Sequence, residues 1–334
     1  MLDAVPSRRR VSGHRHRGVD WLLAITLVAA TLWYAVRWLD VATFPVAVAQ
    51  SLVPVVGIGL VLITTLAAGL RRRRIALAGV AASLVVLVGA LPFVVPSGRE
   101  APGPGDLVVM ASNLEFGGAD VSALLEQVRG RRVDVLVLLE ITPDAVQRLA
   151  AAGLDDLLPY AAGHPRAGAD GTMIRSRYPL TELPTPTFPG EVNLSQPVAL
   201  VTLPGSVTVG GAQQVLVRAV HPMPPTGSNL GFWRASLDGL ATWVHSQPDG
   251  IPLVLAGDFN ASADHPGYRQ VAGGLVDAHL AVGAGWVRTW PQGRRWLPAF
   301  VQIDHVLARG LSATDAGVEV IPGTDHALVW ASWR

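Results

Sequence analysis

The stretch PLVLAGDFN at residues 252–260 joins a short apolar run to an acid and an amide. Short runs of aliphatic residues bounded by Gly, Pro or Asp are typical of buried strands. Asp258 and Asn260 stand two residues apart, so on an extended chain both side chains would point the same way. Polar groups projected from the end of a central strand indicate a functional site rather than a core.

The same pattern recurs along the second half of the chain. Ile-Asp-His at residues 303–305 and Thr-Asp-His at residues 324–326 each adjoin an apolar run. Three single residues stand in the same context, namely Asn113, Glu140 and His221. We expect these strand ends to meet and to form one site.

Many short apolar runs and a few helical segments follow residue 106. The predicted strands are residues 107–113, 133–139, 172–178, 196–203, 214–220, 252–257, 302–308 and 326–332. The predicted helices are residues 121–129, 144–151 and 230–245, with a short one near 265–271. Strands outnumber helices and often follow one another directly. This favours an α/β fold of two packed mixed β-sheets flanked by helices over a doubly wound parallel sheet.

The first third of the chain holds three stretches almost free of charge, at residues 21–36, 41–70 and 75–95. A helix needs about 20 apolar residues to span a bilayer, so we expect three transmembrane helices. A cleaved signal peptide is the alternative interpretation of the first stretch. The expected domains are a cytoplasmic basic tail (1–18), the transmembrane anchor (19–96), a Pro/Gly linker (97–105) and a catalytic domain (106–334).

Arginines predict the orientation of this anchor. Five of them precede the first apolar stretch, and four more form the run 71–74 between the second and third stretches. The connection between the first two stretches carries only Arg37 and Asp40. Because basic loops stay in the cytoplasm, we expect a cytoplasmic N-terminus and an extracytoplasmic catalytic domain at the plasma membrane.

The net charge of the apolar first part of the chain is opposite in sign to that of the remainder. Residues 1–97 carry ten arginines and three aspartates, a net charge of +7, whereas residues 98–334 have a net charge of −6. The chain has no cysteine, which excludes disulfides, thiol chemistry and cysteine-based zinc sites. Nucleic-acid-binding domains are usually basic, so we do not expect nucleic acid as a partner of the acidic domain.

The ordered polar motifs resemble the endonuclease/exonuclease/phosphatase (DNase I-like) superfamily. The resemblance covers residues 106–334 and includes Thr-Trp-Pro at 289–291 ahead of the Ile-Asp-His motif. It implies a DNase I-like four-layer sandwich and a metal-dependent phosphoric ester hydrolase. The apolar segment in front is similar to the anchor of VanJ-type membrane proteins linked to teicoplanin resistance.

The resemblance also implies a metal centre. Glu140 would be the direct ligand, with Asn113 supporting it and Asp325 as a further ligand. Mg²⁺ prefers oxygen ligands and needs only one or two protein carboxylates, so Mg²⁺ is the expected ion, with Mn²⁺ as the alternative.

The remaining motif residues would carry the catalysis. Asp304 would orient His326 by a hydrogen bond to one ring nitrogen. Asp258 would orient or deprotonate water, and either Asp258 or His326 is the general base. Asn260 would donate to a phosphoryl oxygen, and His221 to a phosphate oxygen or the leaving group.

Anchorage and charge together favour a substrate in the cell envelope. We expect a lipid-linked phosphate or pyrophosphate of the polyprenyl type, met at the outer face of the bilayer. The alternatives are a surface-tethered extracellular nuclease and a non-catalytic membrane binding module of the same fold.

Overall fold

The computed structural model describes residues 13–97, 101, 103, 105–190, 194–205 and 208–334. The chain forms two compact units. The first contains the residues up to Arg37 together with Val53–Gly89, and the second contains Trp38–Leu52 together with Ala90–Arg334. The start of the expected basic tail and parts of the expected linker lie outside the described residues.

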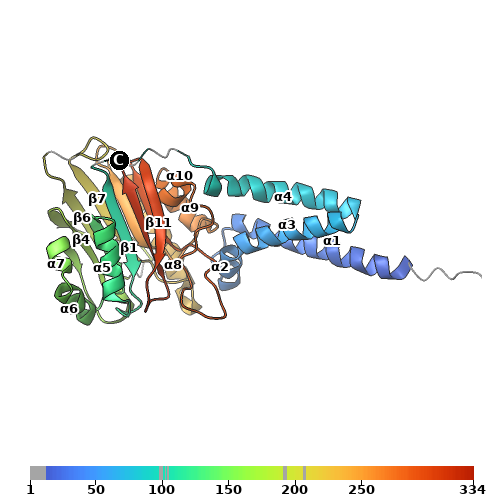
Figure 1. The fold of residues 1–334 in the computed structure, drawn as a ribbon, viewed down its shortest axis with the longest axis horizontal. Helices are drawn as coiled ribbons and strands as arrows, with labels where there is room; N and C mark the ends of the chain where they lie inside the picture. Colours follow the sequence, from blue (N-terminus) through green and yellow to red (C-terminus); the bar gives the residue numbers. More distant parts are fainter. Residues whose placement is uncertain (1–12, 98–100, 102, 104, 191–193, 206–207) are drawn as a thin grey trace, which may run out of the picture. The chain divides into compact units, whose positions relative to one another are not determined.

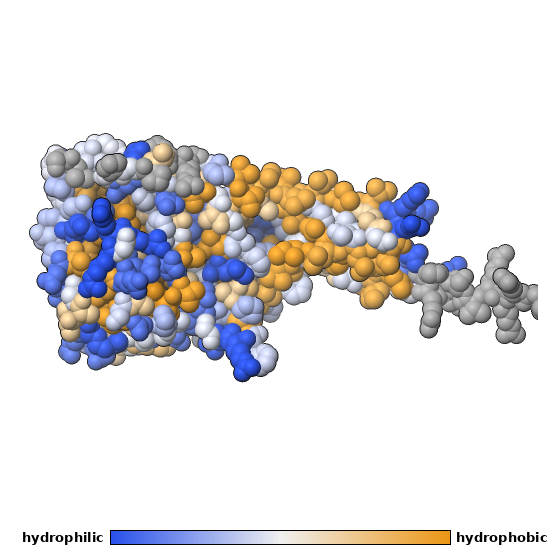
Figure 2. All heavy atoms as spheres, in the orientation of Figure 1, coloured by the Kyte–Doolittle hydropathy of each residue, from blue (hydrophilic) through white to orange (hydrophobic). Residues whose placement is uncertain are grey.

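The first unit is built from apolar helices, namely α1 (Gly13–Ala35), α3 (Val53–Gly69) and most of α4 (Arg73–Val94). Leu27, Tyr34 and Leu60 form part of its small buried cluster. The outward surface of these helices is strongly apolar (Figure 2), as expected for side chains that face lipid.

Two helices of the described chain are long and apolar enough to cross a membrane, over Arg17–Trp38 and Arg73–Val94. The predicted middle span is divided into α2 (Phe44–Ser51) and α3, which meet at an angle of 57°. Together they qualify as a third span only if the bent pair counts as one.

Two six-stranded sheets form the second unit (Figure 1). Their strand orders are β11-β12-β1-β2-β4-β3 and β5-β6-β7-β8-β10-β9. The strands are β1 (Leu107–Asn113), β2 (Val135–Leu139), β3 (Tyr160–His164), β4 (Thr172–Ser176), β5 (Leu180–Leu183), β6 (Val198–Thr202), β7 (Gln214–Val220), β8 (Leu253–Asp258), β9 (Val276–Asp277), β10 (Asp304–Arg309), β11 (Ala313–Val320) and β12 (Ala327–Trp333). Each sheet mixes parallel and antiparallel pairs.

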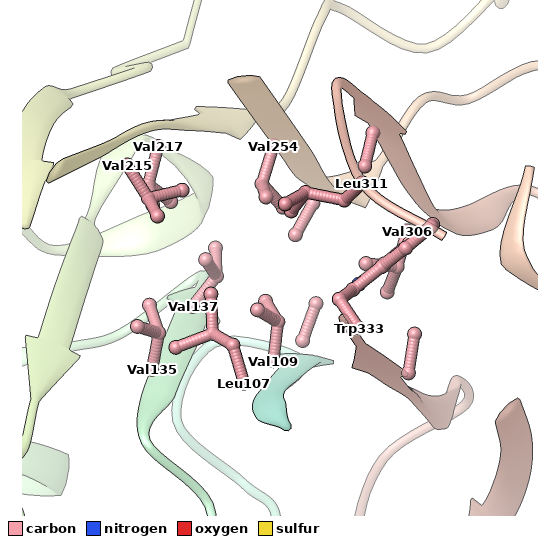
Figure 3. Packing of buried hydrophobic residues seen from close by; sticks show 14 of the residues in the cluster. Leu107, Val109, Val135, Val137, Val215, Val217, Val254, Val306, Leu311 and Trp333 are labelled. Atoms are coloured by element: carbon pink, nitrogen blue, oxygen red, sulfur yellow. The ribbon is translucent and has the colours of Figure 1, made fainter. Parts of the chain in front are cut away.

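The sheets pack face to face over an aliphatic core. Val109 and Val137 of the first sheet lie across from Val217 and Val254 of the second (Figure 3). A second cluster joins the first sheet to α5 (Val121–Gly130), α6 (Pro143–Ala151) and α7 (Leu154–Leu157). A third joins the other sheet to α8 (Leu230–Ser246) and α9 (Pro266–Ala272). The four layers of the predicted sandwich are therefore present.

The predicted α/β fold of two mixed sheets flanked by helices is confirmed, but four strands were missed. These are β3, β5, β9 and β11, and each of them lies at the edge of its sheet. Edge strands face solvent on more sides, so their sequences lack the continuous apolar runs that reveal central strands. The short helices α7 and α10 (Ala278–Val282) were also missed, because neither is long enough to show helical periodicity.

The segment Trp38–Leu52 belongs to the same unit as the sheets. Ala47 of α2 is 2% exposed and is part of the cluster under α8 and α9. Its carbonyl lies 3.0 Å from His265 Nε2. Arg234 of α8 forms an ion pair with Asp40. Asp40 and Ala47 thus contact the unit that contains the sheets, so this segment does not simply continue the expected middle span.

Gly257 fixes how β8 delivers Asp258. Its φ of +144° is a conformation that residues with a Cβ rarely adopt, and a Cβ there would collide with the Val220 carbonyl of β7.

We expect Gly257→Ala to lower the free energy of unfolding of the full-length protein by about 2–4 kcal/mol, because it combines backbone strain with a backbone clash. Gly250→Ala is the matched control, since Gly250 has no neighbour within 4 Å of an added Cβ. Equal midpoints for the two variants in denaturant titrations would contradict this account.

Candidate active site

Parallel strand pairs place four of the predicted residues at one edge of the two sheets. Asn113 is the last residue of β1 and pairs with Leu139, so Glu140 follows directly at the end of β2. Val220 of β7 pairs with Gly257 of β8, so His221 and Asp258 emerge next to each other. The carboxyl ends of parallel strands meet at one edge, which explains why these polar groups converge.

The antiparallel strands β10 and β12 bring the remaining residues to the same edge. Asp304 opens β10 and pairs directly with Asp258 of β8. His326 immediately precedes β12 and is buried. Its Nδ1 lies 2.9 Å from Asp304 Oδ2 and 3.2 Å from Oδ1. The structure therefore brings together the expected His326–Asp304 pair.

The other ring nitrogen of His326 faces two further carboxylates. Nε2 lies 3.8 Å from Asp258 Oδ2 and 3.7 Å from Asp325 Oδ1. Burial disfavours the charged imidazole, but the carboxylates of Asp304 and Asp258 outweigh it and raise the pKa of His326 to about 10. Burial also raises the pKa of Asp258 to about 7, partly offset by the charge of His326.

Glu140 is held in place by two hydrogen bonds. Asn113 Nδ2 donates to its Oε1 at 3.2 Å, and the Phe116 backbone N–H donates to its Oε2 at 3.0 Å. Asn113 Nδ2 also lies 3.3 Å from Asp258 Oδ2, so one amide connects the two carboxylates. Burial raises the pKa of Glu140, and these hydrogen bonds oppose the shift.

His221 is buried beside the carboxylates but makes no direct hydrogen bond to them. Its Nε2 lies 3.8 Å from Glu140 Oε1 and 4.0 Å from Asp258 Oδ2. Its Nδ1 has no hydrogen-bond partner among the described residues. Burial lowers the pKa of His221 to about 3, with a further contribution from His326, so its imidazole is neutral. A neutral imidazole can donate one hydrogen bond to a substrate oxygen.

Asn260 departs from the geometry expected from the sequence. β8 ends at Asp258, and Asn260 has a left-handed φ of +48° rather than an extended backbone. The Asn260 backbone N–H donates to Asp258 Oδ1 at 2.7 Å, and its side chain donates to the Pro222 carbonyl at 3.0 Å. Asn260 thus fixes Asp258 and the chain next to His221, and the expected parallel projection of the two side chains is wrong.

Strained backbone marks the loops around the site. In the described chain, the non-glycine residues with positive φ are Arg71 and Arg132, which lie elsewhere, together with Glu140 itself and three residues whose N–H groups donate to Asn113, Glu140 or Asp258, namely Glu115, Phe116 and Asn260. Such conformations are uncommon for residues with a Cβ and tend to cluster at functional sites.

Asp325 lies at the outer part of the site. Its Oδ2 accepts a 3.1 Å hydrogen bond from Trp290 Nε1 and lies 3.6 Å from the Arg294 guanidinium. Its side chain is 19% exposed, compared with 3% for Asp258. The Asp325 carboxylate is therefore more accessible than that of Asp258 to an ion from solvent.

Several supporting residues were given no role in the sequence analysis. Thr289 Oγ1 accepts from the backbone N–H groups of Ile303 and Asp304 at 3.0 and 3.2 Å. Thr324 Oγ1 donates to the Asn113 carbonyl at 2.8 Å and accepts from the His326 N–H at 3.1 Å. Both threonines belong to motifs already recognised, Thr-Trp-Pro at 289–291 and Thr-Asp-His at 324–326, and their place in these motifs was the available signal.

Trp233 supports the site from α8. Its Nε1 donates to the Asn260 carbonyl at 3.1 Å, and its ring packs edge-on against His265 at 5.4 Å. Nothing in the helical sequence around Trp233 indicates this contact, because it depends on how α8 packs on the sheet.

His305 points away from the site, as its alternation with Asp304 predicts. Its Nδ1 lies 3.0 Å from Tyr268 Oη and its Nε2 lies 3.0 Å from the Ala261 carbonyl. The Tyr268 hydroxyl donates a 2.6 Å hydrogen bond to Asp277 Oδ2, which completes this buried group. Burial opposes ionisation of Asp277, but His305 outweighs it and lowers the pKa to about 2. This group stabilises the fold and takes no part in the site.

The donor set fits a divalent cation. Carboxylate oxygens of Asp258 and Asp304 and a ring nitrogen of His326 lie within 4.8 Å of one another. Glu140 and Asp325 border the same group. The charged imidazole of His326 balances part of this negative charge, and the remaining carboxylates, Glu140 and Asp325, offer the oxygen ligands that suit Mg²⁺ or Mn²⁺.

Comparisons with known proteins establish the fold and the family. No match exists among curated proteins. Humanised TDP2 of D. rerio shares 16% identity with a TM-score of 0.53, covering 69% of this chain and 99% of that one. Truncated Caenorhabditis elegans TDP2 also shares 16% identity with a TM-score of 0.53, covering 68% of this chain and 97% of that one. A Bacteroides thetaiotaomicron endonuclease/exonuclease/phosphatase family protein shares 15% identity with a TM-score of 0.50, covering 70% of this chain and 98% of that one.

Identities this low establish the shared fold alone. The family itself is established by sequence, because residues 110–326, from β1 to His326, match the model of the Endonuclease/Exonuclease/phosphatase family. The chain therefore belongs to the endonuclease/exonuclease/phosphatase family, whose members are usually hydrolases that act on phosphoesters.

Proposed function

We propose that this protein is a membrane-anchored, Mg²⁺-dependent phosphoesterase that acts on a lipid-linked phosphate or pyrophosphate at the outer membrane face. The observation that carries the proposal is the buried His326–Asp304 pair, which faces Asp258 at the same strand edge as Glu140 and His221. This cluster occurs in a chain that also has apolar helices long enough to cross a bilayer.

Glu140 would hold the metal, with Asp325 as a further ligand and Asn113 keeping Glu140 in position. Asn113 suits this role because its amide already bonds Glu140. A bound Mg²⁺ would polarise a phosphoryl oxygen and stabilise the charge on the leaving oxygen.

The protein's own side chains would supply the proton transfers and the positioning. Asp258 Oδ2 and His326 Nε2 face each other at 3.8 Å, and we assign activation of the attacking water to this pair. Asp304 holds the imidazole of His326 in place through Nδ1. His221 donates to a phosphate oxygen. The backbone N–H of Asn260 holds Asp258 in the observed arrangement. Its side-chain amide would donate to the phosphoryl group after breaking its hydrogen bond to the Pro222 carbonyl.

Charge and tethering favour a lipid substrate. The part of the chain after residue 97 has a net charge of −6, which does not suit the many phosphates of a nucleic acid. Twelve residues separate the end of α4 at Val94 from the start of β1 at Leu107. An extended chain of that length spans about 40 Å at most, so the catalytic domain stays near the bilayer.

Three spans require the bent pair of α2 and α3 to count as one span, beside the helices over Arg17–Trp38 and Arg73–Val94. With three spans and the basic run at 71–74 in the cytoplasm, the catalytic domain would be extracytoplasmic.

The resemblance to VanJ-type proteins makes polyprenyl pyrophosphate of cell-envelope synthesis the first substrate to test. A tethered nuclease is the competing activity, since a D. rerio TDP2 structure of the same fold was solved with a single-strand DNA product.

We expect the full-length protein in detergent to release phosphate from polyprenyl pyrophosphate in the presence of Mg²⁺, and to leave double-stranded and single-stranded DNA intact. EDTA and Asp258→Asn should each abolish the release, because they remove the metal and the carboxylate beside His326. Cleavage of DNA alone would replace the proposal with a tethered nuclease, and no turnover of either substrate would favour a binding module.

Asp304→Asn should lower kcat by about 10²–10⁴-fold, since it removes the carboxylate that fixes and charges His326. KM should change much less, because Asp304 lies behind the imidazole rather than against the substrate. Asp249→Asn is the control, as the Asp249 side chain is 98% exposed. Steady-state kinetics on the active substrate measures both constants. Similar kcat values for Asp304→Asn and Asp249→Asn would show that Asp304 has no part in the mechanism.

The orientation can be tested with single cysteines, because the natural chain has none. In intact cells a membrane-impermeant maleimide should label Asp249→Cys in the catalytic domain, and should label Arg71→Cys only after permeabilisation. The reverse pattern would place the catalytic domain in the cytoplasm.

A further inference from the structure

A hairpin with an exposed tip projects from the strands that carry the site. Trp290 and Val301 form its stem through hydrogen bonds from Trp290 N to Val301 O (3.0 Å) and from Val301 N to Trp290 O (3.3 Å). Residues 292–298, here named the arginine–tryptophan tip, lie between the two sides. Trp296 is 86% exposed and Leu297 is 47% exposed. Neither side chain therefore contributes to the core of the catalytic domain.

The hairpin is basic although the catalytic domain is acidic. Residues 286–300 contain Arg288, Arg294 and Arg295 and no acidic residue. The Arg288 guanidinium lies 5.3 Å from the centre of the Trp286 ring, and that of Arg295 lies 4.9 Å from the Trp296 ring. The hairpin and the segment leading into it thus present cations and aromatic rings together, and the tip contributes Arg295 and Trp296.

The tip is connected directly to the site. The Gln292 N–H donates to the Asp325 carbonyl at 2.7 Å, and the Trp290 indole donates to the Asp325 carboxylate at 3.1 Å. A second exposed aromatic residue borders the same site, since Phe116 is 59% exposed and its N–H donates to Glu140. Exposed apolar residues therefore lie on two separate loops that bond site carboxylates.

We propose that the arginine–tryptophan tip binds a bilayer surface that carries anionic headgroups, and that it holds the site opening against the lipid from which substrate comes. The inference rests on the proposed membrane function and adds the surface through which the domain meets the bilayer. Tryptophan rings favour the interfacial layer, and arginines contribute attraction to anionic lipid. The charge of the tip complements such a surface, whereas the remainder of the domain would be repelled by it.

Single-stranded nucleic acid also binds arginines and aromatic rings, but it needs a basic groove that follows its backbone. The hairpin carries three arginines and no acidic residue, but it belongs to a domain with net charge −6. A local basic and aromatic tip matches a planar anionic surface better than an extended polyanion.

The test uses the full-length protein reconstituted in vesicles and a spin label at Leu297→Cys, with Val320→Cys as the control. Val320 is 60% exposed at the end of β11 and lies outside the hairpin. In phosphatidylglycerol-rich vesicles, the Leu297 label should lose collisions with a water-soluble nickel complex and gain collisions with oxygen. The Val320 label should stay open to the nickel complex. Because the readout needs no catalysis, its failure is distinct from failure of the proposed activity.

Charge dependence provides the second arm of the test. Arg288→Gln and Arg295→Gln, each combined with the Leu297 label, should lower the ratio of shielded to open label by about fivefold per arginine. Replacing the anionic vesicles with phosphatidylcholine vesicles should also lower this ratio. Equal nickel accessibility at Leu297 and Val320 in anionic vesicles would overturn the proposal. Shielding of the Leu297 label by an oligonucleotide, but not by vesicles, would overturn it in favour of nucleic acid.

Discussion

The pairing of β8 with β10 is the constraint on which the site depends. Its register places Asp258 directly opposite Asp304, and a slip by one residue would turn one carboxylate to the other face of the sheet. Like charges placed opposite each other across a strand pair repel, and here both are buried. His326 lies against both carboxylates, so the imidazole stabilises a charge arrangement that the register alone would make unfavourable.

Support for this arrangement reaches outward to the segment between the first two apolar helices. His265 lies between the Ala47 carbonyl of α2 and the ring of Trp233, and Trp233 donates to the Asn260 carbonyl. Asn260 in turn donates to Asp258. Burial lowers the pKa of His265 to about 4, so this link stays neutral at physiological pH. The residues between the helices are thus part of the scaffold of the catalytic domain.

Central strands and the residues that end them could be predicted from the sequence, because their apolar runs are continuous and a polar group marks each end. Edge strands such as β11 could not, since a half-exposed strand has no such run. The grouping of Asp258, Asp304 and His326 was implied by the family resemblance, yet the left-handed backbone of Asn260 and the contact of Trp233 depend on tertiary packing. The bend between α2 and α3 was not predicted, because both helices are free of charge and form one uninterrupted uncharged stretch.

If these strand ends form a metal-binding catalytic site, the full-length protein should bind Mn²⁺ through Glu140, which EPR can measure. Titration with wild-type protein should remove the signal of free Mn²⁺, and Glu140→Gln should restore most of that signal. Glu126→Gln, at an exposed position on α5, should bind as the wild type does. Mn²⁺ binding that is unaffected by Glu140→Gln, or absent from the wild type, would exclude a metal site held by Glu140.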